Sequence, residues 1–123
     1  MNVGDTFIPV SLARGDHLHV VISRPTVGGL VAVVNLTSAR WDSDTCCVLQ
    51  PGDHPWVRHD TVALYSHSTL IAVPDLETGI ARSVLRAHDP MGLAPLRRLQ
   101  DGALLCEQTP EKVLEAVRRT LDS

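Results

Sequence analysis

The sequence predicts a mainly β (α+β) protein in which five or six short strands form a small barrel or curled sheet, followed by C-terminal helices. Short apolar runs alternate with turn-forming segments through residues 6–73, and the apolar spacing becomes helical near the C-terminus. The length of 123 residues suits a single domain, residues 1–123. Aromatic residues make up only 3% of the chain, so the core must consist mainly of Val, Leu, Ile and Ala.

Five apolar runs are expected to form strands because they are rich in β-branched residues and end at turn-forming residues. They cover residues 6–11, 17–23, 30–38, 45–50 and 61–73, and the last run is long enough for two strands. Pro25, Gly28 and Gly29 separate the second run from the third, because proline lacks the ladder donor and glycine permits positive φ. This succession of short strands and turns is typical of a small barrel.

The strongest helix signal begins at Thr109, which is expected to cap the helix. Pro110 suits the first turn, and Glu111 faces the positive end of the helix dipole. Glu115 lies one turn before Arg119, a spacing that favours an ion pair. The apolar stripe at helical spacing consists of Val113, Leu114, Val117 and Leu121.

Two segments before this helix are less regular. Residues 94–100 are expected to form a short helix that ends at Asp101-Gly102. Residues 74–87 leave helix and loop open, because Thr78-Gly79 interrupts a helical spacing of apolar residues. The layout is therefore a β-rich body with a helical C-terminal third.

The charge balance excludes a general attraction for polyanions. Eleven basic and fourteen acidic residues give a net charge of -3, so nucleic acid would need a local basic patch. Three cysteines without zinc-ligand spacing are expected to be reduced, small apolar residues of a cytoplasmic protein. Neither a basic leader nor a run of about 18 uncharged apolar residues is visible, so the sequence predicts no export and no membrane contact.

Three of the apolar runs carry polar side chains at one end, of kinds suited to acid/base or hydrogen-bonding chemistry. They are His17 and His19 in the second run, Asn35, Thr37 and Ser38 in the third, and Tyr65 and His67 in the fifth. Side chains alternate along a strand, so His17 shares a face with His19, and Asn35 shares one with Thr37. If these strands pair, the polar groups converge on one site.

The order of elements and several short motifs resemble the MazF/PemK/Kid toxin family. Gly4-Asp5 resembles the opening Gly-Asp of that family, residues 35–38 resemble its strand ending in Thr-Ser, and residues 60–64 resemble its Asp-Ser-Val strand. Residues 94–121 take the place of its terminal helix. The resemblance implies an SH3-like barrel that acts as the toxin of a type II toxin-antitoxin system and cleaves single-stranded RNA.

The resemblance also implies a catalytic set of His17, Thr37 and His67. Thr37 matches the family directly, whereas His17 stands where the family often has arginine and His67 where several members have glutamine. The implied reaction is metal-independent attack of a ribose 2'-hydroxyl on the neighbouring phosphorus, without a cofactor. Imidazole serves as acid or base near neutral pH, so the two histidines are expected to share the proton transfers, in either order, while Thr37 donates to phosphate.

Six further residues are expected to contact the substrate through charge, hydroxyl groups or aromatic rings. They are Arg14, Arg24, Ser38, Tyr65, Trp56 and Arg58. The resemblance implies three partners: single-stranded RNA, a cognate antitoxin protein and a second copy of the chain in a homodimer. Structural roles are the alternatives, because Thr37 and Ser38 can end a strand by bonding to backbone and Tyr65 can be a ring at the edge of the core.

Two other functions remain open. His54, His59 and Asp53, together with His17 and His19, are ligand types for zinc or another divalent ion, although their spacing matches no zinc motif. The chain could also be a non-catalytic SH3-like barrel of the CcdB type, which acts by binding a protein partner. The missing family arginine suits that alternative, and an RNA cleavage assay separates the two.

Overall fold

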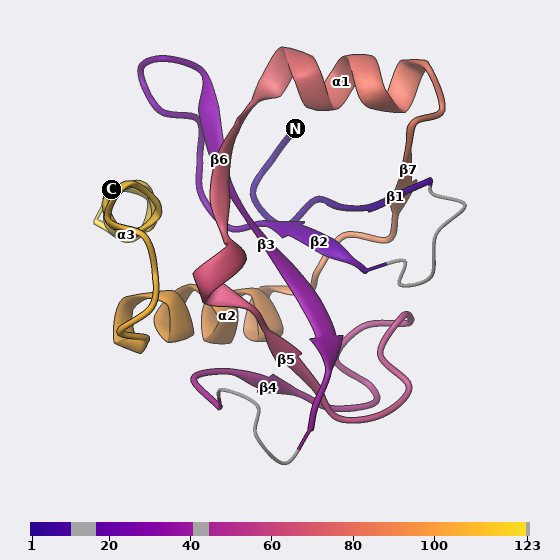
Figure 1. The fold of residues 1–123 in the computed structure, drawn as a ribbon, viewed down its shortest axis with the longest axis vertical. Helices are drawn as coiled ribbons and strands as arrows, with labels where there is room; N and C mark the ends of the chain where they lie inside the picture. The colour runs from indigo at the N-terminus through magenta and orange to yellow at the C-terminus, as the bar shows by residue number, and fades with distance from the viewer. Residues whose placement is uncertain (11–16, 41–44, 123) are drawn as a thin grey trace.

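The computed structural model describes residues 1–10, 17–40 and 45–122. The described residues form an α+β fold (Figure 1), which confirms the predicted class. The elements in chain order are β1 (Thr6–Pro9), β2 (His19–Val21), β3 (Leu30–Ser38), β4 (Val48–Leu49), β5 (Thr61–Ala63), the 3-10 helix η1 (Tyr65–His67), β6 (Thr69–Ala72), α1 (Val73–Ala81), β7 (Leu85–His88), α2 (Leu93–Leu105) and α3 (Glu111–Leu121).

The nine-residue strand β3 organises the sheet. All pairs are antiparallel and run in the order β4-β5-β3-β2-β1-β7, with β6 paired to β3 beside this path. The first half of β3 pairs with β6, and its last three residues pair with β5. Within the described residues β4 and β7 are end strands with one neighbour each, so the predicted closure into a barrel is not shown.

Both faces of the sheet bury apolar residues, because alternate residues of β2 and β3 enter two separate cores. Val20 and Val34 belong to the larger core, which also contains Leu99 of α2 and Val117 of α3. Val21, Val33 and Phe7 belong to the smaller core, which is closed by Leu76 of α1. The helix α1 therefore covers one face and the pair α2 and α3 covers the other. This two-sided burial explains why the strands read as near-continuous apolar runs.

The helices confirm the C-terminal prediction and correct three details of it. Proline 110 is the N-cap residue of α3, while the buried hydroxyl of Thr109, the expected cap, has no hydrogen-bond partner among the described residues. Glu115 and Arg119 do not form an ion pair in the described part of the chain. The helix α2 continues through Gly102 to Leu105, because Gly102 lets the helix lie directly on Tyr65 and Cys47.

The segment left open by the sequence becomes helix α1 and strand β7. Gly79 remains within α1, where the space beside it is filled by the side chain of Leu85. Ser83, with a φ of 59°, turns the chain so that β7 returns along β1. No helix in the described ranges combines the length and the apolar composition that are needed to cross a bilayer.

Candidate functional site

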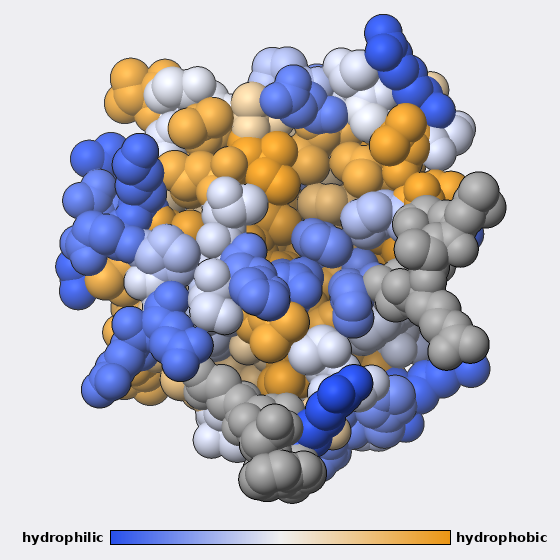
Figure 2. Space-filling view, viewed as in Figure 1, coloured by the Kyte–Doolittle hydropathy of each residue, from blue (hydrophilic) through white to orange (hydrophobic). Residues whose placement is uncertain are grey.

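The sheet face that carries α1 is covered at one end only, and its uncovered part is polar. Val21 and Val33 lie under α1, whereas His19, Asn35 and Thr37 on the same face are half-buried. Figure 2 shows hydrophilic residues gathered over the middle of this face, where β2, β3 and η1 lie in Figure 1. We call His17, His19, Asn35 and Thr37 the polar strand face.

The pairing of β2 with β3 brings the expected residues of the polar strand face together. His19 lies opposite Asn35, and the same register continued by two residues places His17 opposite Thr37. A hydrogen bond from the Leu36 amide to the Leu18 carbonyl, 2.9 Å long, extends the pairing to this point. The two polar pairs are therefore of the non-hydrogen-bonded kind, in which opposing Cα atoms are only about 4.5 Å apart.

Backbone carbonyls orient both imidazoles of the polar strand face. The Nδ1 atom of His17 lies 3.1 Å from the Leu36 carbonyl oxygen, and that of His19 lies 2.9 Å from the His17 carbonyl oxygen. A carbonyl can only accept, so each Nδ1 carries the hydrogen and donates it. In the neutral ring Nε2 then has a free lone pair, which is the arrangement that a general base requires.

His19 is the more constrained of the two histidines. Its ring stacks on Phe7 with centroids 5.2 Å apart. Burial lowers the pKa of His19, and the nearby His17 lowers it further, while the bond to the His17 carbonyl opposes both effects. His19 is thus held neutral near pH 7, and its ring is fixed against Phe7.

The lowered pKa of His19 predicts a pH dependence of stability. The unfolded chain, with a pKa of about 6.5, binds a proton at His19 before the folded protein does. The free energy of unfolding should therefore fall as pH decreases from about 6.5 towards the lowered pKa of the folded state. Urea unfolding between pH 8 and pH 5 measures the slope, which should be smaller for His19→Gln. Equal slopes for the two proteins would contradict the prediction.

His67 reaches the same strand from the other side. It ends the three-residue turn η1, which interrupts the strand formed by β5 and β6 beside Val34 and Asn35 of β3. The Leu64 amide bonds to the Asn35 carbonyl at 2.9 Å just before this turn. The His67 side chain is exposed, and its ring has no hydrogen-bond partner among the described residues. No hydrogen bond joins it to the polar strand face in the described part of the chain.

A second hydroxyl–imidazole pair lies at the end of β3. Ser38 Oγ and His59 Nε2 are 2.8 Å apart, and both side chains are exposed beside Arg58. Ser38 follows Thr37 directly, so its side chain leaves the strand on the opposite face. The sequence did not connect Ser38 with His59, because only the pairing of β3 with β5 brings the loop before β5 to this strand end.

Several predicted substrate contacts lie away from the polar strand face. Arg24 follows the other end of β2, seven positions from His17, which corresponds to roughly 20 Å of extended chain. Tyr65 is 1% exposed and its hydroxyl donates to the Leu99 carbonyl at 2.7 Å, so it cannot stack on a base. Burial raises the pKa of Tyr65. Trp56 is half-buried against the larger core, and Arg14 lies outside the described residues.

The histidine and aspartate suggested as zinc ligands have other partners. His54 is buried, and its ring receives the Trp56 amide hydrogen at Nδ1 while Nε2 donates to the Asp89 carbonyl. Asp53 pairs with Arg98. Burial alone would raise the pKa of Asp53, but the hydrogen bond from the Gln50 amide and the Arg98 guanidinium outweigh it and lower the pKa. The described residues contain no group of three or more such side chains that could hold a metal ion.

Comparison with models of known protein families, with characterised proteins and with solved structures finds no match to this chain. The MazF/PemK resemblance therefore rests on the order of elements and the short motifs. The function has to be argued from the geometry of the site.

Proposed function

We propose that the protein is a metal-independent endoribonuclease that cleaves single-stranded RNA on the polar strand face, as the toxin of a type II toxin-antitoxin pair. The observation that carries the proposal is that the β2–β3 register, continued two residues beyond β2, places His17 opposite Thr37, and that Nε2 of His17 has no hydrogen-bond partner among the described residues. The imidazole supplies a proton acceptor, and the hydroxyl supplies a hydrogen-bond donor to the phosphoryl oxygens.

The proposed reaction needs two proton transfers. One imidazole takes the proton of the ribose 2'-hydroxyl as its oxygen forms a bond to phosphorus, and the bond from phosphorus to the 5'-oxygen breaks. The second imidazole, protonated, gives its proton to that leaving oxygen. His17 and the exposed His67 are our candidates for these roles, while Thr37 and the Asn35 amide donate to the phosphoryl oxygens. The products are a 2',3'-cyclic phosphate and a 5'-hydroxyl.

The remaining parts of the proposal concern location and partners. A toxin of this kind would act in the cytoplasm, be held inactive by a cognate antitoxin and work as a homodimer. The outer edge of β7 is one place where another chain could add, because β7 has a single neighbour in the described sheet and Val84 beside it is 57% exposed. In the CcdB-type alternative, such a surface would also bind another protein chain, but no RNA would be cleaved.

The test is an RNA cleavage assay with purified protein and a synthetic single-stranded RNA. The proposal expects cleavage in EDTA, cyclic phosphate ends, and no cleavage at a linkage whose 2'-hydroxyl is replaced by hydrogen. Cleavage that EDTA abolishes, or products with a 5'-phosphate, would contradict the mechanism. Stable binding of a protein partner without cleavage of a broad set of RNA sequences would favour the CcdB-type alternative.

A further inference from the structure

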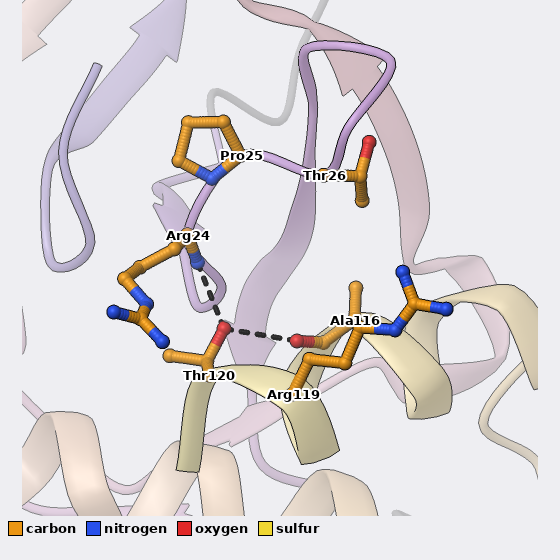
Figure 3. A pocket seen from close by; sticks show the side chains of 6 residues that line it. All are labelled: Arg24, Pro25, Thr26, Ala116, Arg119 and Thr120. Atoms are coloured by element: carbon orange, nitrogen blue, oxygen red, sulfur yellow. Dashed lines mark hydrogen bonds between the residues drawn. The ribbon is translucent and has the colours of Figure 1, made fainter. Parts of the chain in front are cut away.

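A pocket of about 310 Å³ lies at the far end of β2 from His17. It is formed by the β2–β3 hairpin and the last turns of α3, and its lining residues are Arg24, Pro25, Thr26, Ala116, Arg119 and Thr120. Figure 3 shows the two guanidinium groups on opposite sides of the space between hairpin and helix. We call this space the hairpin pocket.

The walls of the hairpin pocket are held in place by hydrogen bonds. The Arg24 amide donates to Thr120 Oγ1 at 2.9 Å, and the Thr120 hydroxyl donates to the Ala116 carbonyl at 2.9 Å. Thr26 closes the hairpin, because its hydroxyl accepts from the Leu30 amide and its own amide bonds to the Leu30 carbonyl. The hairpin is thus joined to α3, and the pocket exists without a ligand to form it.

The polar groups that remain available in the hairpin pocket are cationic. Among the described residues neither Arg24 nor Arg119 forms an ion pair with a carboxylate. The Thr120 hydroxyl is engaged with backbone, and the Thr26 hydroxyl in Figure 3 points away from the helix. Two unneutralised guanidinium groups on one pocket favour an anion, and their planar donor arrangement suits phosphate.

The remaining walls of the pocket are apolar. Pro25 provides a ring surface, Ala116 is 4% exposed at the base, and the methyl group of Thr26 is directed towards the helix in Figure 3. The volume is at the lower end of the range for pockets that bind small organic molecules. A flat ring could lie against these walls, or stack on a guanidinium plane, while its phosphate reaches the arginines.

We infer that the hairpin pocket binds one nucleotide, with its phosphate between Arg24 and Arg119 and its base against Pro25 and Ala116. The nucleotide can be free or part of an RNA strand, and both present the same chemistry. The inference does not depend on the proposed cleavage, because the pocket is remote from His17 and a protein can bind a nucleotide without cutting RNA.

The test measures binding of 5'-AMP at low salt by NMR, from the amide shifts of Thr26 and Ala116. Arg24→Ala and Arg119→Ala should each weaken binding about tenfold or more, since each removes a charge-assisted contact. Arg118→Ala is the matched control, because it removes the same charge from the neighbouring exposed position of α3 that does not line the pocket. Thermal unfolding of each variant establishes that it is folded.

Adenosine and inorganic phosphate separate the two parts of the ligand, and each should bind more weakly than 5'-AMP. A short single-stranded RNA that binds more tightly than 5'-AMP, and is weakened by Arg24→Ala, would identify the RNA strand as the ligand; equal affinities would identify a free nucleotide. Absence of 5'-AMP binding, or equal weakening by Arg118→Ala, would overturn the inference. The amides of Thr26 and Ala116 report on the hairpin pocket itself, so this result can be interpreted whether or not the protein cleaves RNA.

Discussion

Replacing His17 with alanine is expected to lower RNA cleavage by about 10²- to 10⁴-fold, the usual contribution of a general acid or base. His17 is half-buried two residues before β2, where the β2–β3 register continued beyond the strand places it opposite Thr37, and its Nδ1 donates to the Leu36 carbonyl. Removing the ring removes the proton acceptor that this pair presents. The rate constant for cleavage of a fluorescent RNA at saturating protein measures the effect.

The His17→Asn variant separates chemistry from structure. The asparagine amide can replace Nδ1 as donor to the Leu36 carbonyl, but it cannot exchange a proton near neutral pH. If His17 carries a proton, His17→Asn should be as inactive as His17→Ala. Activity restored by asparagine would show that His17 only positions the strand. Wild-type activity in His17→Ala would remove it from the mechanism and shift attention to His67 or to the Ser38–His59 pair.

The second large effect is expected from Gly102→Ala, which should lower the free energy of unfolding by at least about 2 kcal/mol. Alanine normally stabilises a helix interior relative to glycine by roughly 1 kcal/mol. At Gly102, however, the added methyl group would collide with the Tyr65 hydroxyl and lie 2.9 Å from Cys47 Cβ and 3.0 Å from the Cys46 carbonyl oxygen. Chemical denaturation measures the change.

The side chains around Gly102 have little room to move away from an added methyl group. Tyr65 is 1% exposed and bonded to the Leu99 carbonyl, and Cys47 is buried beside it, where burial raises the pKa of its thiol. Gly92→Ala, at the N-cap residue that precedes α2, is the control, because the nearest atoms there are 3.8 Å away and the φ of -63° suits alanine. Gly102→Ala should regain part of its stability when Tyr65→Phe removes the hydroxyl. A stabilised Gly102→Ala protein would contradict this packing.

Local patterns in the sequence were sufficient for six of the seven strands in the described part of the chain, all but β7, and for the existence of the two terminal helices. The β-branched runs and the 3.6-residue spacing are properties of neighbouring residues, and they predicted β3 and α3 closely. The same patterns failed where distant residues decide the structure. Gly102 appeared to end a helix, but contact with Tyr65 explains why glycine occupies a helical position. Gly79 obscured α1 because glycine disfavours the interior of a helix. The structure shows that Leu85, from the later strand β7, fills the space beside Gly79.

For the candidate site, alternation along the strands was enough to place His17 with His19 and Asn35 with Thr37 on shared faces. The register between β2 and β3 was needed to bring the two histidines opposite Asn35 and Thr37. A slip of one residue would move every side chain of β2 to the other face of the sheet. Arg24 shows the limit of this reasoning. The sequence suggested that Arg24 adds positive charge beside the histidines. Arg24 follows the opposite end of β2 from His17, however, and lines the hairpin pocket.

The sequence by itself determined the α+β class, the elements with strong periodicity and the residue types available for chemistry, because propensity and alternation act between near neighbours. Only the tertiary structure decided which of those residues meet. It paired His17 with Thr37, joined Ser38 to His59, buried Tyr65 and placed Arg24 beside Arg119. The physical reason is that strand register and helix docking are set by burial of apolar surface from the whole chain, which no local segment contains.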